Sequence, residues 1–426
     1  MPFVIAEPLL ITIVALSILL MLWRPRGIPE VYWVSAGACL LVALRLVPLR
    51  LAIHAISEGS DVYLFLIGMM LLSELARENG VFDWVAATAS HASRGSRGRL
   101  FALTYAVGIA VTACMSNDAT AVVLTPAILT AVRRSKVDPL PYLFACAMIA
   151  NAASFVLPIS NPANLVVFHT AMPPLGSWLK AFLIPSLLSI ATTFVVLRVW
   201  YRKELSGRID EEEAEETVAL DRYGKSVLVG IAVVVCVLLG ASALKMDLGL
   251  PTCLAAIVIT SAVCIQRRMN PLPLLREISW ATLALVAALF VLVNAVETTG
   301  VLGTLEAGLH RIIAMGSISG ALIASLVVAT ANNLVNNLPL GLAAGAIIAR
   351  SHIPSLFTHV VLIGVDLGPN LSVTGSLATI LWLLALRREG LHVKAIDFLK
   401  VGLIAMPAAL LAAVLGLFLT QWVFGA

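Results

Sequence analysis

The sequence predicts an all-α polytopic membrane protein with ten transmembrane helices and two re-entrant hairpins, arranged as two inverted repeats. Composition is the first indication, because 60% of the 426 residues are hydrophobic and only 12% are charged, whereas soluble domains carry about 25% charged residues. The second is that long apolar segments recur along the whole chain. The third is that two segments in each half are interrupted by polar clusters, in the same order.

The first apolar run, 3–23, is preceded by no basic segment and followed by no small-residue cleavage site. It is also too long for the apolar core of a signal peptide, so we expect it to stay as a transmembrane helix. Further uninterrupted segments predict the other simple spans. These segments lie at 28–47, 62–78, 178–200, 224–244, 250–266, 279–296 and 398–423.

Segments 99–132 and 318–349 are too long for one crossing and carry a polar break near the middle. In the first, the arm on each side of Ser116-Asn117-Asp118 would reach only about 21–22 Å, short of a hydrocarbon core of roughly 30 Å. These lengths predict re-entrant hairpins whose tips stop within the membrane. Two short tilted spans joined by an exposed turn are the alternative.

Segments 140–170 and 356–388 are interrupted in a different way. Pro158 and Pro162 break the first, and Gly368-Pro369 breaks the second. We expect discontinuous helices in which unwound backbone lines a cavity, as in secondary transporters built from inverted repeats.

The two halves can be aligned at these interruptions. An ungapped alignment that sets Asn151 against Asp366 pairs the broken helices, and setting Asn117-Asp118 against Asn336-Asn337 pairs the hairpin tips. Five spans per half is an odd number, so the second half would enter the membrane inverted. The predicted units are a first repeat at 1–200, a cytoplasmic acidic linker at 201–223 and a second repeat at 224–426.

The distribution of Lys and Arg predicts the orientation. Most of these residues fall in alternate connections, and the positive-inside rule assigns those connections to the cytoplasm when both termini lie outside. The acidic run from Asp210 to Glu216 then lies in the cytoplasm. It is most simply a solvated linker, and a contact for a soluble partner is the other interpretation.

Several motifs resemble those of the ion transporter superfamily. Ser116-Asn117-Asp118-Ala119-Thr120 resembles the hairpin-tip motif of the divalent anion:sodium symporters, and Ser160-Asn161-Pro162-Ala163-Asn164 resembles their unwound turn. Within the superfamily the chain is most similar to the ArsB arsenite and antimonite efflux proteins. The marks of that similarity include Trp23-Arg24-Pro25-Arg26-Gly27, Asn336-Asn337 before Pro339, and above all Asp366-Leu367-Gly368-Pro369 with Gly375-Ser376-Leu377-Ala378-Thr379.

The resemblance implies scaffold and transport domains, elevator-type alternating access, and export of arsenite and antimonite against protons across a bacterial-type inner membrane. In some relatives a cytoplasmic ATPase subunit takes part. The second hairpin, however, is unusually rich in asparagine. The alternative is a sodium- or proton-coupled carboxylate or anion transporter, or a sodium/proton antiporter, of the same superfamily.

The polar residues at the interruptions suit a neutral substrate. Arsenite at neutral pH is a mostly uncharged trihydroxide, which needs neutral donors and acceptors, whereas an anion site would be expected to add Arg or Lys. Neither residue type occurs in the tips or unwound turns. The candidate substrate-binding residues are Ser116, Asn117, Ser160, Asn161, Asn164, Asn336, Asn337, Asn370, Thr374 and Ser376.

Other chemistries fit less well. Three thiolates could capture As(III), but only Cys114 lies near a tip, so it is a minor candidate. We expect no bound metal and no cofactor. An enzyme is also not expected, because the sequence has neither a His-Glu-x-x-His motif nor a Gly-x-Ser-x-Gly elbow.

Proton coupling requires a group that can be protonated inside the membrane. Asp118 and Asp366 are the two carboxyl residues within the polar interruptions, and intramembrane carboxylates are functional candidates. One or both are expected to carry the exchanged proton. The alternative is that each caps the N-terminus of a half-helix and stays ionised.

Overall fold

The computed structural model describes residues 3–170, 172–209 and 219–424, and its regular elements are all helices. Six helices in these ranges are long and apolar enough to cross a membrane, and a bent pair, Leu49–Glu58 with Ser60–Glu78, adds a seventh if it counts as one span. The predicted all-α polytopic fold is confirmed, and the count of ten spans stays a prediction. The acidic run 210–216 lies outside the described residues.

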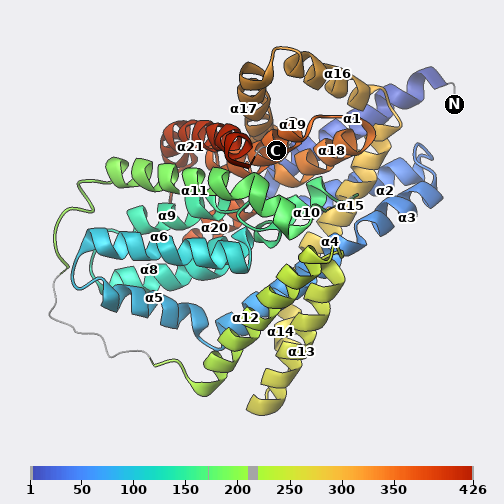
Figure 1. Ribbon diagram of the computed structural model, residues 1–426. Coiled ribbons are helices and arrows are strands. Elements are labelled where there is room, and N and C mark those ends of the chain that lie inside the picture. The colour runs from blue at the N-terminus through green and yellow to red at the C-terminus, as the bar shows by residue number, and fades with distance from the viewer. Residues whose placement is uncertain (1–2, 171, 210–218, 425–426) are drawn as a thin grey trace.

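The first half of the chain runs from α1 to α11 (Figure 1). Its hairpin consists of α6, the short α7, a π-helical turn η2 and α8, and its broken helix consists of α9 and α10. The bounds are α1 Phe3–Trp23, α2 Glu30–Ala43, α3 Leu49–Glu58, α4 Ser60–Glu78, α5 Val81–Ala92, α6 Arg97–Cys114, α7 Asn117–Ala119, η2 Thr120–Leu124, α8 Thr125–Arg134, α9 Leu140–Ala152, α10 Pro162–Val167 and α11 Leu175–Trp200.

The second half has the same order of elements. Here α17 and α18 form the hairpin, and α19 and α20 form the broken helix. The bounds are α12 Arg222–Ala243, α13 Gly249–Arg267, α14 Leu272–Glu277, α15 Trp280–Glu297, α16 Val301–Ile313, α17 Ser317–Val335, α18 Asn337–Arg350, α19 Ser355–Leu367, α20 Leu377–Arg388 and α21 Ala395–Phe424.

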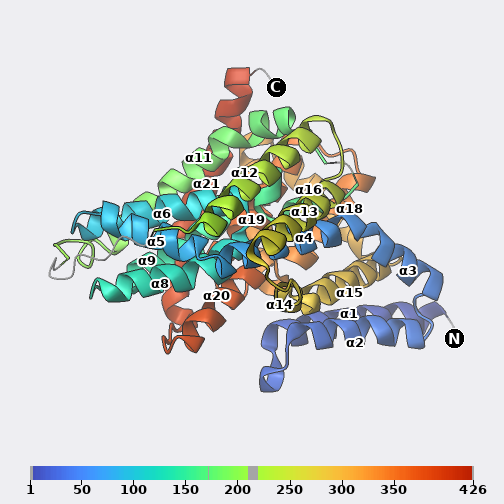
Figure 2. The ribbon, with the colours of Figure 1, turned by 90° about the horizontal axis from the view of Figure 1, so that it is seen from below.

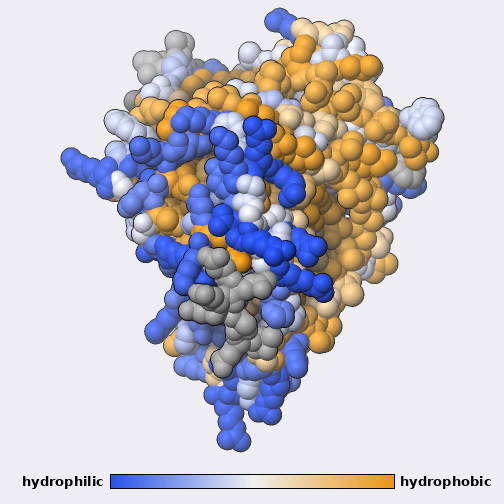
Figure 3. All heavy atoms as spheres, turned by 90° about the vertical axis from the view of Figure 1, so that its left-hand side faces the viewer, coloured by the Kyte–Doolittle hydropathy of each residue, from blue (hydrophilic) through white to orange (hydrophobic). Residues whose placement is uncertain are grey.

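The halves are interleaved rather than side by side. Helix α2 packs on α15 and α4 packs on α13, while the long helices α11 and α21 lie together (Figures 1 and 2). Hydrophilic residues gather over the end where α5, α6, α8 and α11 meet, and hydrophobic residues cover much of the adjoining flank (Figure 3). That hydrophilic end holds basic connections that the positive-inside rule assigns to the cytoplasm.

The predicted register of the broken helices matches the element bounds. Helix α9 ends at Ala152 and α10 begins at Pro162, and the corresponding bounds of α19 and α20 are Leu367 and Leu377. These bounds coincide in the ungapped alignment.

The predicted register of the hairpin tips is wrong by one residue. The residue before each second arm is Ser116 in the first half and Asn336 in the second. Asn117 therefore corresponds to Asn337, and Asp118 corresponds to Leu338. The chain needs one more residue to turn at the first tip, and sequence comparison of such short motifs does not detect that difference.

The tips are enclosed by protein. Asn117 is 1% exposed and Asn337 is 4% exposed, which excludes the alternative in which each tip is an exposed turn. Four short helices between the spans, α3, α5, α14 and α16, were not expected from hydropathy. They are short and mixed in polarity, so a search for long apolar segments passes over them.

Helix α18 of the second hairpin lies against α10 of the first broken helix. Two glycines of α18 permit this approach. A Cβ atom added at Gly345 would lie 2.8 Å from the backbone oxygen of Val167, and one at Gly341 would touch the Val167 side chain at 3.4 Å. Elements from opposite halves are therefore packed backbone to backbone.

We expect Gly345→Ala to destabilise the protein by about 1–3 kcal/mol, because the added methyl group overpacks a contact with backbone rather than with a flexible side chain. Thermal unfolding of the purified protein in detergent measures the effect. Gly303→Ala in α16 is the matched control, since a Cβ atom there meets nothing within 4 Å. Equal unfolding temperatures for the two variants would contradict the expectation.

Candidate functional site

The two hairpin tips meet at a small cavity of about 20 Å³. This tip cavity has room for about one water molecule. Its walls come from both halves and from the neighbouring helices α4 and α15. The lining residues are Leu66, Asn117, Asp118, Asn161, Pro162, Thr282, Asn337, Leu338, Leu377 and Ala378.

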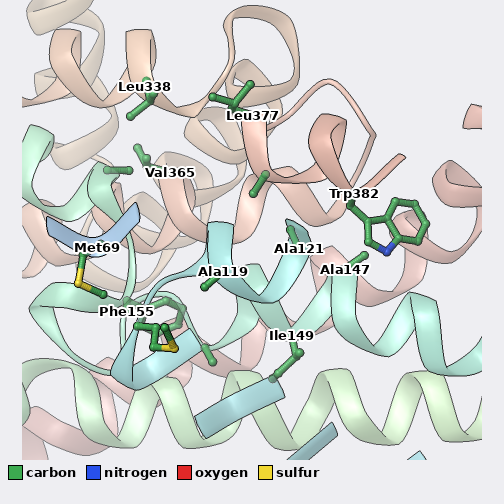
Figure 4. Close-up of a cluster of buried hydrophobic side chains, with 14 of the residues drawn as sticks. Met69, Ala119, Ala121, Ala147, Ile149, Phe155, Leu338, Val365, Leu377 and Trp382 are labelled. Atoms are coloured by element: carbon green, nitrogen blue, oxygen red, sulfur yellow. The ribbon is translucent and has the colours of Figure 1, made fainter. Parts of the chain in front are cut away.

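Residues of the tip cavity correspond between the halves. Asn117 matches Asn337 at the tips, and Pro162 matches Leu377 at the starts of α10 and α20. Leu338 and Leu377 lie next to each other above the alanines of the first hairpin (Figure 4). The cavity therefore lies where the two halves face each other.

A second, wider cavity of about 190 Å³ continues from the tip cavity. The two share Leu66, Asp118, Pro162, Thr282 and Leu377. The wider cavity extends past Ser73 and Glu74 of α4 to the connection between α13 and α15, where Glu277 and Ser279 line it. Arg267 ends α13 and Arg268 begins that connection, so the connection lies on the predicted cytoplasmic side.

The charge of this wider cavity is acidic. Three carboxyl residues line it, Glu74, Asp118 and Glu277, and no Lys or Arg is among the lining residues of either cavity in the described ranges. Arg77 lies one turn from Glu74 and donates to its carboxylate from Nε at 2.9 Å. The described residues contain no group of three His, Cys, Asp or Glu close enough to hold a metal ion.

Side chains cap the helices that begin at the interruptions. The Ser116 hydroxyl accepts a hydrogen bond from the Ala119 amide (3.2 Å), Asn161 Oδ1 accepts from Ala163 (3.0 Å), and the Ser376 hydroxyl accepts from Thr379 (3.1 Å). These residue types are favoured at helix N-termini. Neither Asp118 nor Asp366 occupies such a position, so the alternative in which the aspartates are the caps is wrong.

The second tip turns differently. Asn336 has φ of 73° and ψ of 157°, a strained backbone conformation that residues other than glycine rarely adopt. The backbone amide of Asn337 then donates to the Gly375 carbonyl at 3.0 Å, and Asn336 Nδ2 donates to the Thr374 carbonyl at 3.3 Å. The second tip is thus bonded to the unwound turn of its own half.

Two buried hydrogen bonds between side chains join the broken helices of opposite halves. Asn161 Nδ2 donates to Asp366 Oδ1 at 2.8 Å, and Asn151 Nδ2 donates to Asn370 Oδ1 at 2.9 Å. All four residues are at most 2% exposed. Because Asn161 also caps α10, Asp366 fixes the orientation of a residue that lines the tip cavity.

The predicted site residues take different places. Five of them line the tip cavity or the wider cavity. Asn336 instead lines a third cavity of about 10 Å³, which Arg24 also lines. The five are Ser116, Asn117, Asp118, Asn161 and Asn337.

The remaining predicted residues line neither the tip cavity nor the wider cavity. Ser160 bonds to the Ala113 carbonyl and the Leu157 amide, and Asn370 donates to the Met148 carbonyl. Thr374 donates to the Asn333 carbonyl at 3.0 Å. Ser376 is a cap, Asn164 bonds to backbone, and Asp366 pairs with Asn161.

Asn164 has the most extensive backbone role. Its Nδ2 donates to the carbonyl of Ser154 at 2.9 Å and lies within 3.4 Å of the carbonyls of Leu157 and Pro158. Asn117 contrasts with it, because the Asn117 side chain lines the tip cavity and forms no hydrogen bond with the described residues, although the Oδ1 atoms of both Asn164 and Asn117 are buried without a partner. Asn337 Oδ1 is in the same state.

Sequence reasoning missed four polar residues that line the wider cavity, namely Ser73, Glu277, Ser279 and Thr282. They lie at ends of ordinary spans or in a connection, so no interruption of an apolar segment marks them. The carboxyl group of Glu277, shortly after Pro271 and Pro273, is the one signal that could have drawn attention.

Comparison with known proteins gives a consistent family assignment. The citrate transporter family, CitMHS, matches residues 1–364. The arsenical pump membrane protein of Yersinia enterocolitica is 26% identical over 412 residues, covering 92% of this chain and 94% of its own length. That of Escherichia coli K12 is 26% identical over 409 residues, with coverage of 92% and 94%.

A solved structure shares the fold. The YdaH transporter of Alcanivorax borkumensis, described as having an unusual topology, superposes with a TM-score of 0.57 at 14% identity. The match covers 88% of each chain. The sequence resemblance to ArsB proteins is confirmed by the arsenical pump relatives.

We expect Asn164→Ala to lower stability by about 1–3 kcal/mol, because the buried carbonyls of the unwound turn lose their donor. Thermal unfolding in detergent is the measurement. Asn117→Ala removes the same atoms at the tip, where the side chain forms no hydrogen bond with the described residues, and should be nearly neutral. A larger loss for Asn117→Ala than for Asn164→Ala would refute this division of roles.

Proposed function

The chain belongs to the CitMHS citrate transporter family, and from this premise we propose that it exports arsenite and antimonite from the cytoplasm in exchange for protons. The observation that carries the proposal is the chemistry of the two joined cavities. Amide and hydroxyl groups surround the tips, carboxyl groups line the wider cavity, and Lys and Arg are missing from the described lining.

This lining suits a neutral hydroxylated substrate. Each hydroxyl of arsenite can donate one hydrogen bond, and Asn117 Oδ1 and Asn337 Oδ1 are buried acceptors without partners. The tip cavity is smaller than the substrate, so binding would place arsenite at the junction with the wider cavity beside Asp118. The names of the two arsenical pump relatives support the same substrate class.

Citrate is the competing substrate, because the family is named for citrate transport. A tricarboxylate normally requires Arg or Lys to balance its charge. Here it would meet Asp118 and Glu277 instead, together with Glu74, whose charge Arg77 balances, and like charges at close range in a protein interior are strongly unfavourable. The lining therefore favours the neutral metalloid over citrate, and sodium coupling of an anion remains the alternative to be tested.

Asp118 is the proposed proton carrier. It is the described carboxyl residue that lines both cavities, so a proton can reach it from the cavity that leads to the predicted cytoplasmic side. Asp366 is fully buried, lines neither cavity and accepts from Asn161. We therefore assign Asp366 a positioning role. Exchange of one proton for one neutral arsenite would move one charge, worth about 2.3 kcal/mol per 100 mV.

The proposed moving unit consists of the hairpins and the broken helices. The Asn161–Asp366 and Asn151–Asn370 hydrogen bonds and the α10–α18 contact tie these elements together. Leu66 of α4 and Thr282 of α15 face them across the cavities as the scaffold. Sliding of the unit along this boundary would be elevator-type alternating access, and the present arrangement would face the cytoplasm.

The remaining features of the proposal follow from the family and the basic connections. The protein would be a multi-pass protein of a bacterial inner membrane with both termini outside. An ATPase subunit, where present, would bind on the cytoplasmic side.

We expect Asp118→Asn to lose pH-driven transport. In everted vesicles with an acidic interior, the wild type should accumulate labelled arsenite as protons leave. The accumulation of arsenite by the variant should be at least tenfold lower. Exchange of labelled for unlabelled arsenite, which needs no proton movement, should be retained in Asp118→Asn. That exchange separates lost coupling from misfolding.

Asp366→Asn is the matched control for this experiment. The substitution preserves the shape of the side chain, and arsenite accumulation by this variant should still depend on the pH gradient. The stability of the variant can fall because the hydrogen bond between Asn161 and residue 366 changes. Retained gradient-driven accumulation in Asp118→Asn would refute the assignment of the carrier. Accumulation of labelled citrate on a sodium gradient, with none of arsenite, would refute the proposed function itself.

A further inference from the structure

A separate cavity of about 320 Å³ lies at the end of the spans opposite to the predicted cytoplasmic side. It is formed by the first turns of α11 and α19 and the last turns of α21, and it shares no lining residue with the two cavities at the tips. In the predicted orientation this end of the three helices faces the outside. The proposed transport cycle makes no use of it.

One part of the cavity favours an anion. Lys180 lines it, is exposed, and forms no ion pair among the described residues, and no Asp or Glu is among the described lining residues. His359 lines it as well and packs edge-on against Phe182 at 5.0 Å between ring centroids.

Two helices also begin at this cavity. Helices α11 and α19 start after Pro174 and Pro354, and neither has a side-chain cap. Their first amide groups and the positive ends of their dipoles are therefore available to a negative group. They add to the charge of Lys180.

The other part of the cavity is apolar. Trp178, Phe182, Leu356 and Leu417 line it, and both α11 and α21 are among the helices apolar enough to cross a membrane. The cavity thus combines a basic rim at the helix ends with an apolar wall along two spans. A soluble anion would leave the apolar wall unused, whereas a phospholipid matches both parts.

We propose that this cavity binds a phospholipid with an anionic headgroup. Lys180 and the starts of α11 and α19 would hold the phosphate, and an acyl chain would lie along Phe182 and Leu417. Because α11 belongs to the first half and α19 and α21 to the second, the bound lipid would bridge the halves. Binding should therefore raise the thermal stability of the whole protein.

The purified full-length protein in detergent provides the test. It is incubated with phosphatidylglycerol or phosphatidylcholine, and retained lipid is counted by native mass spectrometry together with the unfolding temperature. The wild type should retain phosphatidylglycerol several-fold better than phosphatidylcholine. Lys180→Gln should reduce that preference about fivefold, in keeping with ~1 kcal/mol per basic residue at a lipid surface.

Lys245→Gln is the matched control, because Lys245 is an exposed lysine after α12 on the same predicted side and does not line the cavity. It should retain the lipid preference of the wild type. Ala181→Phe, which narrows the cavity along its apolar wall, should lower retention of both lipids while Lys180 is still present. The unfolding temperature of each variant without added lipid reports whether it is folded.

Three results would overturn the proposal. One is equal retention of the two lipids by the wild type. Another is an unchanged preference in folded Lys180→Gln. The third is full displacement of phosphatidylglycerol by millimolar inorganic phosphate, which would indicate a site for a free anion instead of a lipid. None of these measurements depends on arsenite transport.

Discussion

The fold depends on satisfying backbone polar groups where helices stop inside an apolar protein. Every interruption frees amides and carbonyls that would each cost several kcal/mol in hydrocarbon. Asparagine and serine side chains supply several of the missing partners, as in the Asn164 bonds to the turn carbonyls and the Ser376 cap of α20. The polar richness of the interruptions is therefore first a structural requirement.

This requirement changes how polar residues in a membrane site are interpreted. The carboxamides of Asn164 and Asn370 donate to backbone carbonyls and line neither the tip cavity nor the wider cavity, so a substrate in these cavities does not meet them. Asn117 and Asn337 instead keep unbonded oxygens beside a cavity. The substrate site is thus smaller than the set of polar residues, and the acidic lining beyond it sets the charge that the site accepts.

Much of the architecture could be predicted from the sequence, because long apolar segments and their interruptions report directly on membrane crossing. The start of α10 at Pro162 follows from proline, and its match with the start of α20 at Leu377 follows from the ungapped repeat. The division of labour among the asparagines could not be predicted, since it depends on which carbonyls lie within reach. Glu277 and Thr282 were missed because residues at span ends carry no distinguishing pattern.

The hydrogen bonds between the broken helices bear on how the protein is made. Asn161 and Asn151 belong to the first half, but their partners Asp366 and Asn370 are 205 and 219 residues further along the chain. A ribosome therefore completes the first half long before these partners exist. Until then, the side-chain amides of Asn151 and Asn161 must form hydrogen bonds with other partners, such as water. Assembly of the core is therefore a late step in biogenesis.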